Sequence, residues 1–251
     1  MLRGSAFEPR RSMRRITGLP YAAIVAAPLP LFPLNTPLVP GLVLPLHIFE
    51  HRYRDLVAEL LGIEDEDERE FGVIGIRDGR DVDRDGIDAL YPIGTATVLR
   101  QSERFDDGRY DIVTTGSRRF RLLDVDDSEP LLRAQVEFLD DVLDPADTLL
   151  AAEVSRSFLH YRAALGGQVP DNIVDEDDDS DDLPEDPTVL SYLVTAAMVL
   201  PTDERQGLLA AASTGERLLR ARSLLSRETA LITALSALPA LDLPGLPPSV
   251  N

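Results

Sequence analysis

The sequence predicts an α+β protein in which a β-rich N-terminal part precedes an α-helical C-terminal part. From residue 29 to about residue 140, short apolar segments alternate with turn residues, which is typical of strands. After Pro145 the apolar residues recur instead with the period of about 3.6 residues that marks helices. Because 44% of the 251 residues are hydrophobic, the chain can bury sizeable cores and a globular fold is expected.

The β-rich part is expected to contain strands over residues 29–34, 42–46, 71–77, 90–100, 109–116, 118–126 and 131–139. Asp107-Gly108 stands between two of them and favours a tight type I′ turn, whose two central residues both need positive φ. One helix interrupts this region near His51, and Gly62 ends it. Its apolar positions recur at helical spacing and are Tyr53, Leu56, Val57, Leu60 and Leu61.

The C-terminal part is expected to contain helices over residues 146–165, 187–200, 202–212 and 214–236. Asp186 followed by Pro187 is an N-cap with proline at the first helical position. Ser213 and Glu216 form a capping box at the start of the last helix. Because none of these helices can bury its apolar stripe alone, a small helical bundle is expected.

The expected organisation is a disordered leader over 1–27, a β-barrel subdomain over 28–142, a helical bundle over 143–238 and a disordered tail over 239–251. The bundle contains an acidic linker over 171–186, since runs of like charge repel one another and stay solvated. The tail is rich in proline, which favours disorder.

The leader imitates a twin-arginine export signal, because Arg14-Arg15 precedes an apolar stretch. Gly18, Pro20 and Pro28 interrupt that stretch, so a disordered leader is the preferred interpretation. The absence of cysteine excludes disulfides and thiolate chemistry and suits a cytoplasmic location. The formal charge of −19 repels polyanions, and no run of about 18 apolar residues exists, so neither nucleic acid nor a membrane is an expected partner.

The chain contains no lysine, because all of its basic residues are arginine. A Walker A loop needs a lysine ammonium group on the nucleotide phosphates. A Ser–Lys dyad needs a lysine whose pKa can fall far enough to act as a base, which arginine cannot do. Both chemistries, and Schiff-base catalysis, are therefore excluded for these residues.

The string His47-x-x-Glu50-His51 matches an inverted zinc-peptidase motif. That chemistry requires both histidines on one face of a helix, so that the two imidazoles converge on one ion. Pro45 and the strand-like residues before it place His47 ahead of the helix, which begins near His51. A structural histidine at a strand–helix junction is the preferred interpretation.

Other chemical motifs are equally incomplete. Residues 81–88 match the first positions of a calcium loop, but Pro92 occupies the position of the bidentate carboxylate, so a polar hairpin loop is expected. No G-x-S-x-G elbow and no G-x-G-x-x-G fingerprint is present. We therefore expect no catalytic residue, no metal ligand and no cofactor.

Several stretches carry a resemblance to a known family: residues 28–57, 71–76, 93–98, 107–122 and 130–141. The long ordered run from LFPL through PG to LPLHIFE-x-RYR is the most specific of them. The chain resembles the N-terminal substrate-binding (LON) domain of Lon protease, in the form found alone in many bacteria, over roughly residues 28–240. The family usually has proline where this chain has His51, and proline fits a first helical turn, so the zinc string is an accident of His51.

The resemblance implies a PUA-like β pseudo-barrel followed by a helical bundle, and a role in recognising and holding protein substrates. It does not imply catalysis, because full-length Lon supplies its AAA+ motor and Ser–Lys protease from other domains. An ATP-dependent peptidase activity of the peptidase S16 type is therefore not expected of this chain.

The leading hypothesis is a non-enzymatic module that binds peptides or unfolded protein segments, through sheet edges or through apolar surface between barrel and bundle. The candidate contact residues are Phe49, Glu50, Tyr53, Arg54, Arg119 and Phe120. A structural alternative places Phe49, Tyr53 and Phe120 in the core. It also makes Glu50 and Arg54 an i, i+4 ion pair.

Three alternative hypotheses differ in class. In the first, the chain is an adaptor or regulator that docks on a protease or another protein machine through its acidic linker. In the second, it binds RNA, as PUA-like barrels do elsewhere, although its charge opposes this. In the third, it is a metal-dependent hydrolase, which stoichiometric zinc would indicate.

Overall fold

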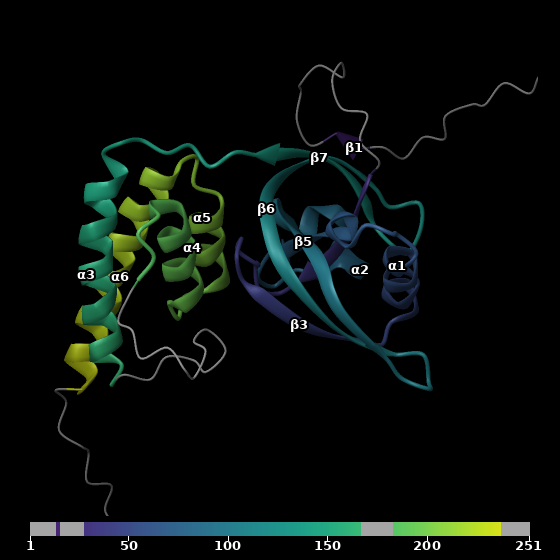
Figure 1. Ribbon diagram of the computed structural model, residues 1–251, viewed down its shortest axis with the longest axis horizontal. Coiled ribbons are helices and arrows are strands. Elements are labelled where there is room, and N and C mark those ends of the chain that lie inside the picture. Colours follow the sequence, from purple (N-terminus) through teal and green to yellow (C-terminus); the bar gives the residue numbers. More distant parts are fainter. Residues whose placement is uncertain (1–13, 16–27, 167–182, 237–251) are drawn as a thin grey trace, which may run out of the picture.

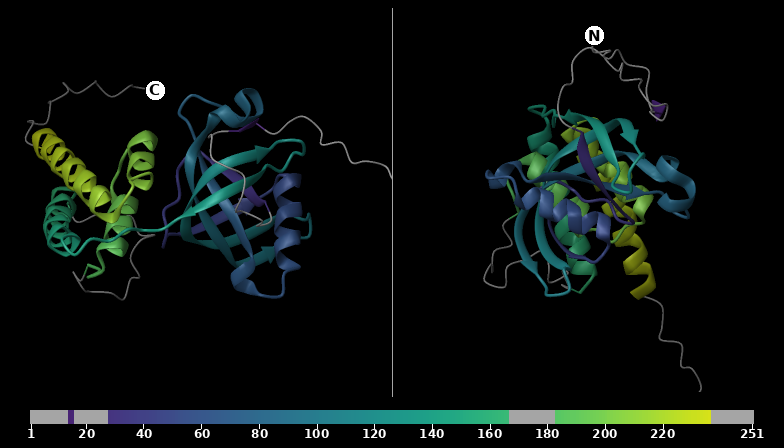
Figure 2. Two further views of the ribbon diagram at one scale, coloured as in Figure 1. Left: turned by 90° about the horizontal axis from the view of Figure 1, so that it is seen from above. Right: turned by 90° about the vertical axis from the view of Figure 1, so that its right-hand side faces the viewer.

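The computed structural model describes residues 14–15, 28–166 and 183–236, which form a sheet-based part and a helical part beside it (Figure 1). The segment that follows the last strand carries the chain from one part to the other (Figure 2). This mixed sheet with separate helices agrees with the predicted α+β class. Most of the predicted leader and linker, and all of the predicted tail, lie outside the described residues.

One mixed sheet contains β1 (Arg14–Arg15), β2 (Leu29–Leu34), β3 (Val43–Ile48), β4 (Glu70–Ile76), β5 (Leu90–Arg104), β6 (Tyr110–Asp126) and β7 (Arg133–Leu139). The strands pair in the order β6–β5–β4–β2–β7, and β7 pairs with β6 again, which closes the circuit. This closed sheet, with β3 beside it, is called the barrel below. Among the strands that the structure describes, only β2 and β4 run parallel. β3 lies outside this circuit and pairs along one side with β6 (Figure 1).

Two details of the β5–β6 hairpin correct the sequence predictions. The strands predicted over 109–116 and 118–126 are one strand, because pairing with β5 continues past Gly116 with a shift in register. The hairpin turn is not of type I′, since only Gly108 has positive φ. The Asp107 carboxylate accepts a hydrogen bond from the Arg109 N–H, and this local bond is compatible with the negative φ that Asp107 adopts.

Helix α1 (His51–Leu61) begins and ends where the sequence predicts, and Gly62 follows it. Its apolar face packs into the barrel, where the rings of Phe32 and Tyr53 lie 4.2 Å apart. A short helical turn, η1 (Glu66–Glu68), lies between α1 and β4, and two more, α2 (Val82–Asp85) and η2 (Gly86–Ala89), lie between β4 and β5. The hairpin loop expected over 81–88 is therefore helical, and the Asp85 carboxylate closes it by accepting the Asp81 N–H.

Helices α3 (Asp147–Ala164), α4 (Pro187–Ala197), α5 (Thr202–Leu209) and α6 (Thr214–Ser236) pack around a second core. Asp186 caps α4 as predicted, since its carboxylate accepts the N–H groups of Thr188 and Val189. The capping box is only partly as predicted, because Ser213 accepts from Glu216 N–H while the Glu216 carboxylate reaches Ala212 N–H.

A further apolar cluster joins the two parts, because Val39 and Ile93 of the barrel pack with Tyr192 and Leu209 of the helices. The side-chain amide of Gln206 also donates to the Ile93 carbonyl across this contact, at 2.8 Å. In the part of the chain that the structure describes, no helix is long and apolar enough to span a bilayer.

A candidate binding groove between barrel and helices

A groove of about 440 Å³ lies where the helical part meets the barrel. Residues 39–43, which lead into β3, form one wall, and one face of α4 forms the other. Ser117 and Asp141 lie between the two walls. Its size and its mainly apolar walls are those of sites that bury a few side chains of a ligand.

The barrel wall is held in place by backbone contacts. Thr95 is fully buried and its hydroxyl donates to the Leu38 carbonyl at 2.6 Å. Gly41 N–H donates to the Gly116 carbonyl, and Gly116 N–H donates to the Leu42 carbonyl, both at 2.9 Å. A Cβ at position 116 would lie 2.6 Å from the Val39 carbonyl oxygen, so only glycine allows this approach. The wall is therefore preformed.

The helical wall is an uncharged face of α4. Thr188, Tyr192 and Ala196 recur every four residues and line the groove together with Val189 and Leu193. The opposite face of α4 enters the second core. Because α4 carries no charged residue between 187 and 197, it offers apolar surface on both sides.

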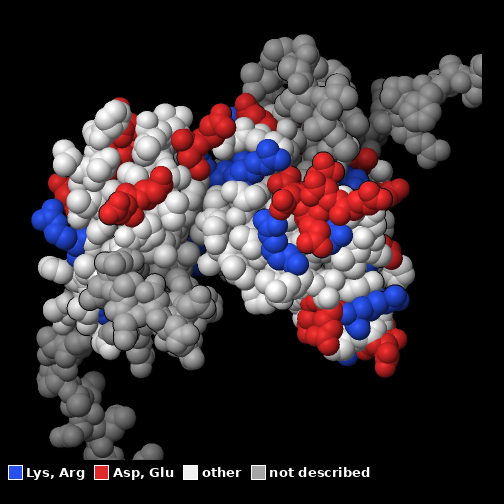
Figure 3. All heavy atoms as spheres, viewed as in Figure 1, with Lys and Arg blue, Asp and Glu red and all other residues white. Residues whose placement is uncertain are grey.

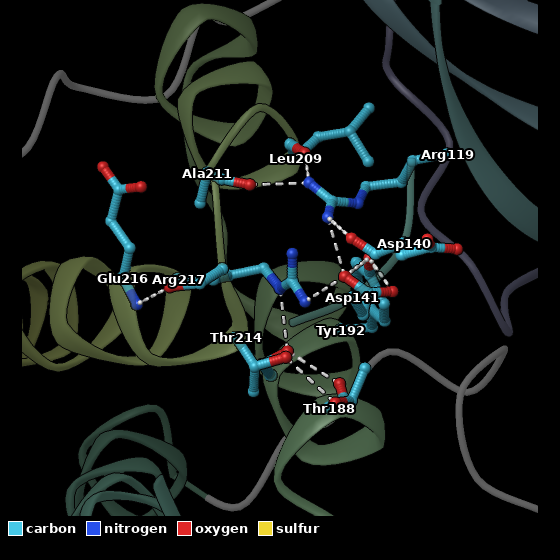
Figure 4. A network of polar contacts seen from close by, with 12 residues as sticks. Arg119, Asp140, Asp141, Thr188, Tyr192, Leu209, Ala211, Thr214, Glu216 and Arg217 are labelled. Atoms are coloured by element: carbon cyan, nitrogen blue, oxygen red, sulfur yellow. Dashed lines mark hydrogen bonds and ion pairs between the residues drawn. The ribbon is translucent and has the colours of Figure 1, made fainter. Parts of the chain in front are cut away.

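At the base of the groove, Asp141 takes part in a buried polar network (Figure 4). Guanidinium nitrogens of Arg119 and Arg217 lie 2.8 Å and 2.9 Å from one Asp141 oxygen. The Tyr192 hydroxyl donates to the same carboxylate at 2.7 Å. Arg119 and Arg217 are 2% and 0% exposed, whereas Asp141 is 24% exposed and reaches the groove.

The two arginines tie together elements that are distant in sequence. Arg119 extends from β6 and donates to the carbonyls of Leu209 and Ala211, where α5 ends. Carbonyls at a helix C-terminus carry partial negative charge and so stabilise a cation there. Arg217 extends from α6, and its guanidinium lies 3.9 Å from the Tyr192 ring centroid. The network therefore fixes the helices against the barrel.

Burial raises the pKa of the Tyr192 phenol well above its ordinary value, and the hydrogen bond to Asp141 adds to this against the opposing effect of Arg217 and Arg119. The unfolded chain ionises its tyrosines near pH 10. The raised pKa therefore contributes stability below that pH, and the contribution is lost as pH rises further. In an ultraviolet titration we expect the last tyrosinate signal to come from Tyr192, so Tyr192→Phe should remove it; a variant with the wild-type curve contradicts this.

The structure does not bring the six predicted contact residues together. Phe49 is 63% exposed, against the structural alternative that placed it in the core. Tyr53 and Phe120 are buried, at 7% and 0%, as that alternative predicts. Arg119 belongs to the polar network behind Asp141.

The side chains of the two charged residues at the start of α1 take different partners. Glu50 pairs with Arg52 at 2.9 Å, so the predicted i, i+4 pair with Arg54 is not the one that forms in the described residues. The guanidinium of Arg54 lies instead over Gly108, at the β5–β6 turn.

The histidines of the zinc string contact different carboxylates. His47 lies on β3 and its ring contacts Asp111 of β6 at 2.5 Å. His51 is the first residue of α1 and contacts Asp55 at 2.8 Å. Among the residues that the structure describes, no group of three histidines, aspartates or glutamates is placed to hold a metal ion.

Comparison with known proteins identifies a family that this chain matches. The family described as the ATP-dependent protease La (LON) substrate-binding domain matches residues 28–227. Lon protease 2 of Sorangium cellulosum is 32% identical over 117 residues, covering 45% of this chain and 14% of that protein. Lon protease of Heliobacterium modesticaldum is 26% identical over 207 residues, covering 81% of this chain and 24% of that protein. The chain thus spans about a quarter or less of the length of these relatives.

Two solved structures show the same fold. A Lon N-terminal domain protein from Xanthomonas campestris has a TM-score of 0.52 at 24% identity, covering 85% of this chain and all of that one (100%). The N-terminal domain of a Mycobacterium avium complex Lon protease has a TM-score of 0.58 at 19% identity, covering 80% of this chain and 97% of that one.

Proposed function

The chain belongs to the LON substrate-binding domain family, and from that premise we propose that it holds apolar segments of other proteins in the groove between barrel and α4. On this proposal it is a non-enzymatic module, its barrel is of the PUA-like type, and α3 to α6 are the family's helical bundle. The observation that carries the proposal is the preformed groove with uncharged walls.

The chemistry of these residues favours binding over catalysis. The family match covers a substrate-binding domain, and the 251 residues contain no lysine for a Walker A loop or a Ser–Lys dyad. Activities of full-length Lon proteases belong to those proteins and are not carried over.

Exposed apolar side chains on both walls support the groove as the binding surface. Val43 is 55% exposed on the barrel wall, and Val189 is 53% exposed on α4. Paired apolar residues that stay accessible beside a concave surface mark interaction sites.

Strand addition to β3, the other binding mode considered, is less favourable. β3 pairs with β6 alone among the described strands, so its second edge faces outward. Pro45, in the middle of β3, has no N–H to donate to an added strand. Side chains in the groove are therefore the stronger source of affinity.

The test is a substitution on the groove wall. Val189→Asp places a charge where the ligand would bury apolar surface, so binding of a labelled, permanently unfolded protein should weaken at least tenfold, or about 1.4 kcal/mol. Leu149→Asp, at a 77% exposed position on α3, is the matched control and should bind like wild type. Equal binding by both variants in fluorescence anisotropy would reject the groove.

A further inference from the structure

A second hollow, of about 560 Å³, lies on the outer face of β3 next to the groove. Val43 lines the groove, while Pro45 and His47 line the second hollow. Alternate residues of a strand point to the same face, so these three side chains form one row. The groove and the second hollow are therefore consecutive along a single strand.

An exposed aromatic group ends this row. Phe49 follows β3 and is 63% exposed, which is unusual for a phenylalanine. The His47 ring lies between two phenylalanines, with centroids 6.4 Å from Phe49 and 6.2 Å from Phe105. β3 runs from the helical part toward the β5–β6 hairpin, which carries Phe105 (Figure 1). Apolar surface is thus offered at both ends of β3.

From this arrangement we infer that the bound segment is extended along the outer face of β3 and is held at two points. One apolar side chain enters the groove beside Val43, and a second contacts Phe49 and Phe105. Phe49 lies six positions after Val43, which corresponds to about 20 Å of extended chain. The inference rests on the proposed function and adds the length and pattern of the ligand.

Charge in the second hollow defines the middle of the ligand. Glu103 and Asp111 line it, and no arginine among the described residues does. His47 contacts Asp111, and it also contacts Arg109 at 3.1 Å, whose guanidinium is already paired with Asp107 outside the hollow. Glu103 has no ion-pair partner in the described ranges. Figure 3 shows acidic and basic side chains gathered at the tip of the β5–β6 hairpin. A segment with arginine or lysine between its two apolar residues therefore complements this surface.

The experiment compares labelled peptides. The long peptide carries leucine and phenylalanine six residues apart with arginine between them, the short peptide carries the leucine half alone, and a third has glutamate in place of arginine. Phe49→Ala should weaken the long peptide about tenfold and leave the short peptide unchanged. Leu149→Ala, another exposed apolar position, is the control and should change neither. The glutamate peptide should bind several-fold more weakly than the arginine peptide at low salt.

The outcomes separate this inference from the proposed function. If Phe49→Ala leaves binding of the long peptide unchanged while Val189→Asp still weakens it, the second contact is wrong and the groove remains the binding site. If the wild-type protein binds neither the peptides nor unfolded protein, both the proposed function and the extended binding mode are wrong. Because Phe49 is exposed, its loss should leave the circular dichroism melting curve unchanged, so weaker binding will not reflect unfolding.

Discussion

Replacing Asp141 with alanine is expected to lower the free energy of unfolding by about 3 kcal/mol, since it leaves two buried guanidinium groups without their counter-ion. Arg119 and Arg217 are almost completely buried, and the Tyr192 hydroxyl loses its acceptor as well. Loss of one partner from a buried ion pair costs roughly 3–5 kcal/mol. We expect the lower end, because Asp141 is 24% exposed and water can enter from the groove.

Urea denaturation measures this change, and the melting temperature should fall by roughly 6–12 °C. The control is Glu153→Ala, which breaks an exposed ion pair between α3 and α6 by removing the partner of Arg222. Exposed pairs contribute about 0–1 kcal/mol, so this variant should remain close to wild type. Equal losses in the two variants would contradict a special role for the buried network.

Gly116→Ala should have the second-largest effect, a loss of about 2 kcal/mol together with weaker peptide binding. The new Cβ would lie 2.6 Å from the Val39 carbonyl oxygen, which is backbone and cannot rotate away. Forcing an added carbon into a packed site costs typically 1–3 kcal/mol. Because Val39 belongs to the barrel wall, its displacement also deforms the groove.

Gly207→Ala is the matched control, since a Cβ at that helical position meets no atom within 4 Å. Alanine is the better helix former, so this variant should gain about 0.5–1 kcal/mol. Thermal melts of both variants test the expected loss of stability in Gly116→Ala and the expected gain in Gly207→Ala. Fluorescence anisotropy with a labelled peptide tests whether binding weakens in Gly116→Ala. A Gly116→Ala protein as stable as wild type would show that the loop can yield without cost.

Local sequence patterns predicted most elements because they depend on neighbouring residues. The apolar run at 29–34 became β2, and the helical period after His51 became α1. Two predicted strands merged into β6 because cross-strand pairing with β5 overrode the turn propensity of Gly116-Ser117. The type I′ turn failed because the Asp107 side chain bonds Arg109 N–H instead.

The candidate site was harder to predict, because its parts meet only through tertiary packing. Asp141, Tyr192 and Arg217 lie far apart in the sequence, and no spacing rule relates them. One signal was available, since α4 is charge-free in a protein with 27% charged residues. Of the predicted contact residues, Phe49 remains a candidate at the surface, while Tyr53 and Phe120 are core residues.

Pro45 has a consequence for the proposed binding of unfolded chains. An accessible, fully hydrogen-bonding strand edge can template aggregation, since each captured strand becomes the edge for the next one. The missing N–H of Pro45 interrupts such growth in the middle of β3, beside the proposed ligand path. On the proposed function, a captured segment would be held through its side chains and released again, without seeding a fibril on β3.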